Sequence, residues 1–153
     1  MSSKWLSVNE QRAWRNFITT VPALTAAFEV DLSKHGVTMG DYEVLVVLSE
    51  AADQQMRMCD LAEALRLSPS GLTRRLDGIV KAGWVQRASC SNDRRVMYAH
   101  LTSAGLAKMQ AAAPDHVASV RRHFLTPLGT AGVEQVGQLF AVVRKHLNHL
   151  QTT

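Results

Sequence analysis

The stretch that decides the fold reads CDLAEALRLSPSGLTRRLDGIVK and covers residues 59–81. It holds two short helical patterns with only Arg66 and Leu67 between them. Ser68 is a typical N-cap residue and Pro69 is favoured at the first position of a helix, so the second helix is expected to begin at Pro69. Two short helices joined by so tight a turn predict a helix-turn-helix.

The second of these helices has one apolar and one polar face. At about 100° per residue, the apolar side chains fall on one arc that would face a core; they are Leu72, Leu76, Ile79 and Val80. The opposite arc, with Arg75 at its edge, carries Ser70, Thr73, Arg74, Asp77 and Lys81. Hydroxyls suit phosphates and base edges, and a guanidinium matches guanine in a major groove. The helix is therefore a candidate recognition helix, although a merely solvated face would show the same pattern.

A small hairpin is expected directly after this helix. Its strands are predicted over 84–88 and 96–101, because both runs are rich in strand-forming residues and a polar turn joins them. Asp93, Arg94 and Arg95 stand where such a hairpin projects furthest. Arginines on this tip can enter a DNA minor groove, and Asp93 can hold one guanidinium in place. The alternative is that these charges only keep an exposed tip soluble.

Helices are expected before the helix-turn-helix. From 14 to 32 apolar residues recur at helical spacing, with a kink expected at Pro22. A more fully buried helix should run from the N-cap Thr38 to about Ala51, followed by a polar loop at 53–55.

Further helices are expected after the hairpin. Thr102 caps one that should bend or break at Pro114, and a last helix with a nearly continuous apolar stripe starts after Thr130. The predicted fold class is therefore mainly α with a small β wing: a winged helix-turn-helix flanked by long dimerisation helices. The predicted domains are an N-terminal dimerisation helix at 1–36, the DNA-binding domain at 37–101 and C-terminal dimerisation helices at 102–153.

Composition and charge exclude several classes of protein. The 153 residues are 46% hydrophobic and 20% charged, which is typical of a globular protein rather than a disordered or fibrous one. The net charge of +4 lies in the centre, because residues 57–101 hold eight basic and four acidic residues and the rest holds nine of each. A polyanion-binding segment between neutral flanks would look like this, and so would chance clustering.

The cellular location is expected to be the reducing cytoplasm. Two cysteines are too few for a disulfide scaffold, and the chain does not open with a basic stretch followed by an apolar one. No apolar run is longer than that at 44–48, which is far shorter than the roughly 20 residues that cross a bilayer.

A set of short motifs keeps a fixed order over about 45 residues of the sequence. The motifs are Leu61-Ala62, Leu65 to Ser68, Leu72-Thr73-Arg74, Lys81-Ala82-Gly83-Trp84-Val85, Asp93-Arg94-Arg95, and Leu101-Thr102 with Gly105. In this combination the sequence resembles the MarR-type winged-helix regulators. The resemblance implies a homodimer with intertwined first and last helices, whose two winged helices grip a palindromic DNA site. It also implies that Arg95 is the minor-groove arginine, with Arg94 as its neighbour.

The resemblance further implies a small-molecule effector. Members of the family commonly release DNA when a phenolic or weakly acidic molecule binds between the dimer helices and the winged helix. Trp14, Phe17 and Tyr42 would supply aromatic walls here, while Thr73 and Arg87 match positions that contact aromatic acids in some members. The alternative is that the aromatic side chains belong to the core.

The predicted function is that of a homodimeric, sequence-specific transcriptional regulator. We expect a repressor that a small aromatic or phenolic ligand releases from a palindromic operator on double-stranded DNA. The residues predicted to contact DNA are Ser68, Ser70, Thr73, Arg74, Arg75, Asp93, Arg94 and Arg95. The alternative is a small basic module that binds a metal or another protein without sequence-specific DNA recognition.

Metal, catalytic and redox sites find little support in the sequence. His146 and His149 lie three apart, but no cysteine or carboxylate cluster completes a tetrahedral set, so neither a metal nor a cofactor is expected. There is no Gly-rich phosphate loop and no Gly-x-Ser-x-Gly, so an enzyme is not expected either. Cys90, beside the basic tip, and Cys59 leave open a thiol that reacts with oxidants.

Overall fold

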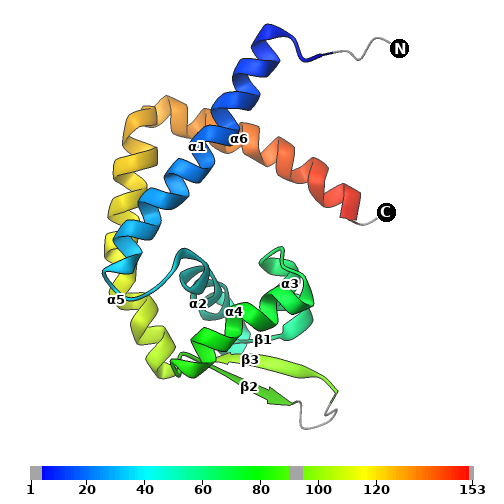
Figure 1. Cartoon of the computed structure of the whole chain (residues 1–153), viewed down its shortest axis with the longest axis vertical. Coiled ribbons are helices and arrows are strands. Elements are labelled where there is room, and N and C mark those ends of the chain that lie inside the picture. Colours follow the sequence, from blue (N-terminus) through cyan, green and yellow to red (C-terminus); the bar gives the residue numbers. More distant parts are fainter. Residues whose placement is uncertain (1–4, 90–94, 152–153) are drawn as a thin grey trace. The chain divides into compact units, whose positions relative to one another are not determined.

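The structure of the chain, a computed structural model, describes residues 5–89 and 95–151 (Figure 1). It divides into two compact units, Met1–His116 and Val117–Thr153. The first unit contains the helix-turn-helix and the sheet, and the second contains the C-terminal helix. None of the helices in the described part is long and apolar enough to cross a membrane.

Helices form most of the first unit, and a small sheet completes it. In chain order its elements are α1 (Val8–Ser33), α2 (Met39–Glu50), the 3-10 turn η1 (Ala52–Gln54), β1 (Gln55–Arg57), α3 (Met58–Ala64), α4 (Pro69–Lys81), β2 (Val85–Ser89), β3 (Met97–Leu101) and the larger part of α5 (Ser103–Val120). The two short helices and the hairpin are confirmed at almost the bounds that the sequence predicts.

The helix starts follow capping signals. α1 begins at Val8, earlier than the expected Trp14, because Ser7 and Glu10 form a capping box. The Glu10 carboxylate accepts a hydrogen bond from the Ser7 N–H at 2.7 Å. The helix then continues through Pro22 to Ser33. The predicted caps Thr38 and Ser68 are confirmed, and Ser68 Oγ accepts from the Gly71 N–H at 3.1 Å.

The sheet has three antiparallel strands in the order β1-β3-β2. The β2–β3 hairpin is the predicted wing, with Val85 opposite Leu101 and Ser89 opposite Met97. The third strand, β1, is not predicted from the sequence, and only its first residue, Gln55, falls in the expected loop at 53–55. It forms because its residues pair with β3, with Met56 opposite Ala99.

The core of the first unit lies between the helix-turn-helix and the sheet. Its buried side chains come from α2, α3, α4 and the sheet, and they include Leu45, Leu48, Leu61, Leu72, Leu76, Ile79, Val85 and Ala99. The apolar arc predicted for α4 is thereby confirmed. Each fully buried leucine contributes about 1.5–3 kcal/mol from the hydrophobic effect. This burial holds α4 in place and leaves its opposite face exposed.

Gly105 lets the first turn of α5 approach the wing closely. The Trp84 carbonyl lies so near that a Cβ at Gly105 would collide with it. Thr102 links the two elements, because its hydroxyl donates to the Gly83 carbonyl at 2.7 Å and accepts from the Gly105 N–H at 3.0 Å. The start of β2 and the start of α5 are thereby fixed to each other.

Gly105→Ala should lower the free energy of unfolding by about 1–3 kcal/mol, because the backbone must shift to admit the new methyl group. Gly78→Ala is a matched control: Gly78 lies within α4 and open space surrounds its Cβ position. This change should raise the free energy of unfolding by about 0.5–1 kcal/mol. Urea unfolding followed by circular dichroism, at one protein concentration, measures both. Equal stabilisation by the two alanines would contradict the close approach at Gly105.

The second unit contains the end of α5, the one-turn π-helical segment η2 (Arg121–Leu125) and α6 (Thr126–Gln151). α5 is not broken at Pro114 and stays helical to Val120. Within α6, Gly129 has non-helical dihedral angles (φ 64°, ψ 174°), so the regular part of this helix begins at about the predicted Thr130. Its apolar stripe includes Phe140, Val143 and Leu147, which are 48%, 53% and 49% exposed in the single chain.

Candidate nucleic-acid interface

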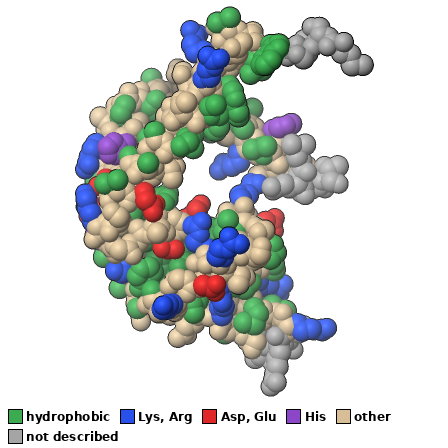
Figure 2. Space-filling view, viewed as in Figure 1, with side chains coloured by type: hydrophobic (Ala, Val, Ile, Leu, Met, Phe, Trp, Pro, Cys, Tyr) green, Lys and Arg blue, Asp and Glu red, His purple; other side chains and the backbone are tan. Residues whose placement is uncertain are grey.

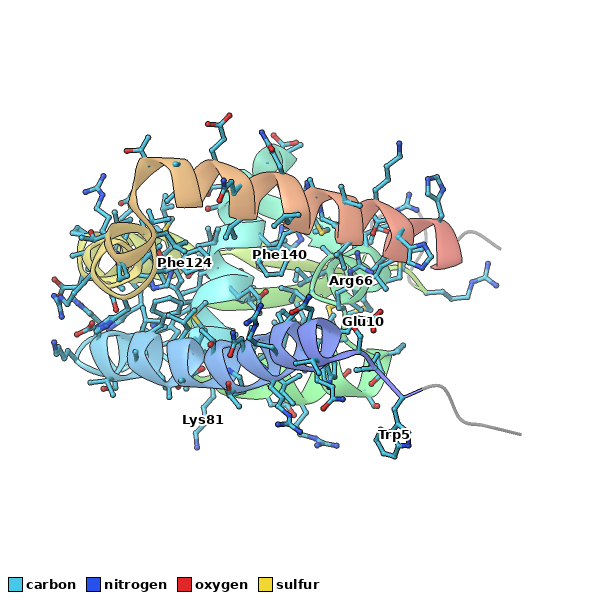
Figure 3. The ribbon with its side chains drawn as sticks, turned by 90° about the horizontal axis from the view of Figure 1, so that it is seen from above. Trp5, Glu10, Arg66, Lys81, Phe124 and Phe140 are labelled. Atoms are coloured by element: carbon cyan, nitrogen blue, oxygen red, sulfur yellow. The ribbon has the colours of Figure 1, made fainter. Side chains whose placement is uncertain are left out.

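The polar face of α4 is open to solvent. Ser70, Thr73, Arg74, Asp77 and Lys81 are all exposed, as the predicted outer arc requires. Figure 3 shows the Lys81 side chain pointing away from the ribbon. Figure 2 shows basic side chains over this part of the first unit, with acidic groups among them. A helix fixed by one buried face and offering donors on the other has the form needed to enter a major groove.

The hydroxyl groups of this region also have local partners. Ser68 Oγ caps α4 and lies 3.2 Å from Ser70 Oγ. Thr73 Oγ1 donates to the Pro69 carbonyl at 3.0 Å. These bonds hold the three hydroxyls in fixed directions at the N-terminal half of α4. A DNA phosphate near Ser68 or Ser70 would meet hydroxyls that are already oriented.

Arg75 lies between two helices. It is half-buried, and its guanidinium packs against Gly40 in the first turn of α2, where a Cβ at Gly40 would occupy the same space. The sequence places Arg75 only at the edge of the outer arc, and its contact with DNA stays a prediction. In the structure Arg75 connects α4 with α2.

Arg87 and Thr73, predicted from different elements, come together. Arg87 Nη2 donates to the Thr73 carbonyl at 2.9 Å and to Asp77 Oδ1 at 2.8 Å. The sequence analysis names both residues as effector contacts, but it does not predict that they contact each other, because Arg87 lies on β2 and both acceptors lie on α4.

The wing tip is described only in part. Arg95 is exposed and lies in a turn, two residues before β3 begins at Met97. Asp93 and Arg94, together with Cys90, lie outside the described residues. Behind the tip, Arg57 Nε donates to the Tyr98 hydroxyl at 3.2 Å. Arg57 is thus a further basic group near the wing that the sequence analysis did not single out.

The aromatic residues predicted to line an effector pocket lie in separate places. Trp14 and Phe17 stack on α1 with ring centroids 6.0 Å apart, and both are partly exposed. Tyr42 is buried and packs on His116, with centroids 4.8 Å apart. Phe28 also contacts His116, at 5.7 Å, and it lies about 21 Å along α1 from Trp14 at 1.5 Å per residue. The first pair therefore does not share a site with Tyr42 in the single chain.

His116 is a polar group whose burial the sequence does not indicate. Its Nδ1 is buried and has no hydrogen-bond partner among the described residues. Burial lowers the pKa of His116 and raises the pKa of Tyr42. Burial therefore favours the neutral form of the imidazole, whose ring packs against those of Phe28 and Tyr42.

The described part of the chain shows no metal site, and its described cysteine has a local partner. No group of three His, Cys, Asp or Glu side chains is placed to hold a metal ion there. Cys59 is exposed, and its thiol donates to Asp60 Oδ1 at 3.3 Å.

The arrangement of α2, α3, α4 and the three-stranded sheet is a winged helix-turn-helix, a class of DNA-binding fold. Comparisons with known proteins assign the family. The model of the MarR family matches residues 37–97. The structure of AbsC, a MarR family transcriptional regulator from Streptomyces coelicolor, is 41% identical, with a TM-score of 0.90 over 96% of this chain and 99% of that one.

Two further relatives extend the comparison. Sco3205, a MarR family regulator from the same organism solved in complex with DNA, is 30% identical with a TM-score of 0.88, over 94% of both chains. The HTH-type transcriptional repressor YetL of Bacillus subtilis (strain 168) is 26% identical over 108 residues, which is 69% of this chain and 65% of that protein. The chain belongs to the MarR family. It is a DNA-binding transcriptional regulator and not an enzyme.

Proposed function

We propose that the chain is a homodimeric repressor that binds a palindromic operator. The observation that carries this proposal is the exposed polar face of α4, held on a buried core beside the wing strand β2. In this proposal residues 37–101 bind DNA. Arg74 and Thr73 read base edges in the major groove. Ser68, Ser70 and Arg75 contact the DNA backbone or hold α4 in position on it. The wing-tip residues act in the minor groove, and they are Asp93, Arg94 and Arg95.

Dimerisation is supported by apolar surface that the single chain leaves exposed. Residues 1–36 and 102–153 supply it in our proposal, and the large exposed side chains there include Trp14, Phe17, Ile18, Val21, Val133, Leu139, Phe140, Val142, Val143 and Leu147. Monomeric proteins rarely leave so much apolar surface on long helices. A two-fold dimer would cover it and would place two recognition helices for a palindromic site.

Repression is supported by the relative YetL, whose name describes a repressor. We further propose that a small aromatic or phenolic effector releases the DNA, as the resemblance to the family implies. Trp14, Phe17, Tyr42, Thr73 and Arg87 are the candidate contacts. The effector acts by favouring a dimer whose two recognition helices are wrongly spaced for the operator. A protein that meets its operator on chromosomal DNA works in the cytoplasm.

Trp14 should report the effector. Its ring is partly exposed on α1, so a bound aromatic acid that covers it or moves α1 should change its fluorescence. We expect one member of a panel of aromatic acids and phenols to shift the emission and to weaken operator binding over the same concentration range. Trp14→Phe separates its signal from that of Trp5 and Trp84. If no compound changes either quantity, the effector proposal is wrong.

Operator binding is tested with the intergenic DNA upstream of the chain's own gene. Fluorescence anisotropy, at two salt concentrations, compares this DNA with a scrambled duplex of equal length. A repressor binds its own sequence at least about 10³-fold more tightly than the scrambled one. Equal, weak and strongly salt-dependent binding to both would indicate the alternative, a basic module without sequence-specific recognition.

A further inference from the structure

Arg87 reaches from the wing strand to the recognition helix. It lies opposite Ala99 in the β2–β3 ladder, and Ala99 is fully buried. Opposed residues point to the same face of a sheet, so Arg87 lies on the face that packs against the helices. Its Nη2 joins the Thr73 carbonyl and the Asp77 carboxylate, which are one turn apart on α4. One side chain thus connects β2 with two points of the helix.

The same contact gives Asp77, an acidic residue on the recognition helix α4, a positively charged partner. The Asp77 side chain is 63% exposed on the outer arc, and Arg87 is 29% exposed. An unpaired carboxylate on this arc would repel the phosphates of a bound DNA. The guanidinium beside it offsets that charge and leaves Arg74 and Lys81 to set the sign of the face.

Arg87 lies close to the end of β2 from which the wing tip continues. β2 ends at Ser89, two residues further on and about 7 Å away at strand spacing. The wing tip follows directly. At the other end of β2, Thr102 and Gly105 fix the strand to α5. The contact between Arg87 and α4 therefore fixes the position of the end of β2 relative to α4.

We propose that Arg87 is a positioning residue that sets the register between the recognition helix and the wing. This rests on the proposed function, in which α4 reads the major groove and the wing contacts the neighbouring minor groove. The two elements can match one operator only if their spacing is fixed. Arg87 fixes it by holding β2 to the middle of α4.

The test compares Arg87→Met, Arg87→Lys and the control Gln86→Met in selections on randomised operators. Gln86 is exposed and opposes His100, so it lies on the other face of β2. Arg87→Met should keep the base preferences of α4 but lose the A·T preference of the flanking minor groove, with an affinity about tenfold lower. Arg87→Lys can still donate to both acceptors and should keep both preferences, as should Gln86→Met.

Thermal unfolding is measured on the same variants, because a purely structural role would move stability rather than the flanking preference. A partly exposed ion pair contributes little to stability, so Arg87→Met should unfold close to the wild type. Asp77→Asn removes one charged acceptor and should weaken the flanking preference in part; it decides the question if Arg87→Met does not fold.

Two results would overturn the proposal. One is an Arg87→Met protein that selects the wild-type operator with unchanged affinity. The other is a uniform loss of all base preferences together with a lowered melting temperature. A wild-type protein that selects no operator at all would instead refute the proposed function, so the two failures are distinguishable.

Discussion

Leu147→Asp will abolish operator binding and leave monomers or unfolded chain. Leu147 lies on the apolar stripe of α6 with Phe140 and Val143, at the i, i+3 and i+7 spacing that places the three side chains on one face. In the proposed dimer this face is buried against the partner. A carboxylate there would be desolvated without a partner charge, which opposes association.

The expected loss of operator affinity follows from the loss of binding to two half-sites at once. A monomer holds only one half-site, so its operator affinity should fall by at least about 10³-fold, towards the level of non-specific binding. Sedimentation measures the mass, and anisotropy measures binding to the operator.

Gln138→Asp is the matched control for this change. It adds the same charge to α6, but at about 100° per residue it lies on the side opposite Leu147. This variant should remain dimeric and bind DNA. A Leu147→Asp protein that is folded, monomeric and still binds the operator tightly would show that dimerisation is not required.

Arg74→Ala and Arg95→Ala should weaken operator binding in different ways. Arg74 is exposed on the outer arc of α4 and should contact a base edge. Its loss should cost about 1–3 kcal/mol in each half-site and relax the preference at one position. The homodimer doubles the effect, because one gene change removes the contact from both halves.

Arg95 should act through the charge and width of the minor groove. Arg95→Ala should leave most major-groove preferences in place and make the salt dependence less steep by about two units of log K against log salt, one for each half-site. Affinities at several salt concentrations and selections on randomised operators measure both variants.

Arg12→Ala removes an equal charge from the exposed part of α1 and serves as the control. It should change neither the base preferences nor the salt slope. An unaltered base preference for Arg74→Ala would refute its role as a base reader. An unchanged affinity for Arg95→Ala would refute its role in the minor groove.

The parts of the fold that were predictable are those with local signals. Ser68 and Pro69 mark the start of α4 by capping and by a preset backbone angle. Leu72, Leu76 and Ile79 repeat at helical spacing, so the buried face of the helix follows from the sequence before the core is known.

The parts that were missed depend on pairing or on weaker signals. β1 has only the three residues Gln55–Arg57, too few to show an alternating pattern, and it forms because β3 offers free backbone groups. Ser7 and Glu10 form a capping box, which indicates that α1 starts at Val8. The helical spacing of apolar residues begins only at Trp14, and a prediction based on that spacing therefore starts the helix too late.

The candidate site shows the same division. That Arg74 faces outwards follows from the helical period. The contacts of Arg75 with Gly40 and of Arg87 with Asp77 depend on how helices and strands pack, which no local pattern specifies. The burial of His116 depends on packing too, since its partners Phe28 and Tyr42 lie on other helices.

Selection of the wild-type protein on fully randomised duplex DNA tests the central claim most directly. A homodimer that reads DNA with α4 and the wing should enrich a palindrome whose half-site centres lie about one helical turn, 10–10.5 base pairs, apart. A·T-rich positions should flank the base-specific ones, where Arg95 enters the minor groove. Enrichment of a single non-repeated half-site, or of no sequence at all, would contradict the claim.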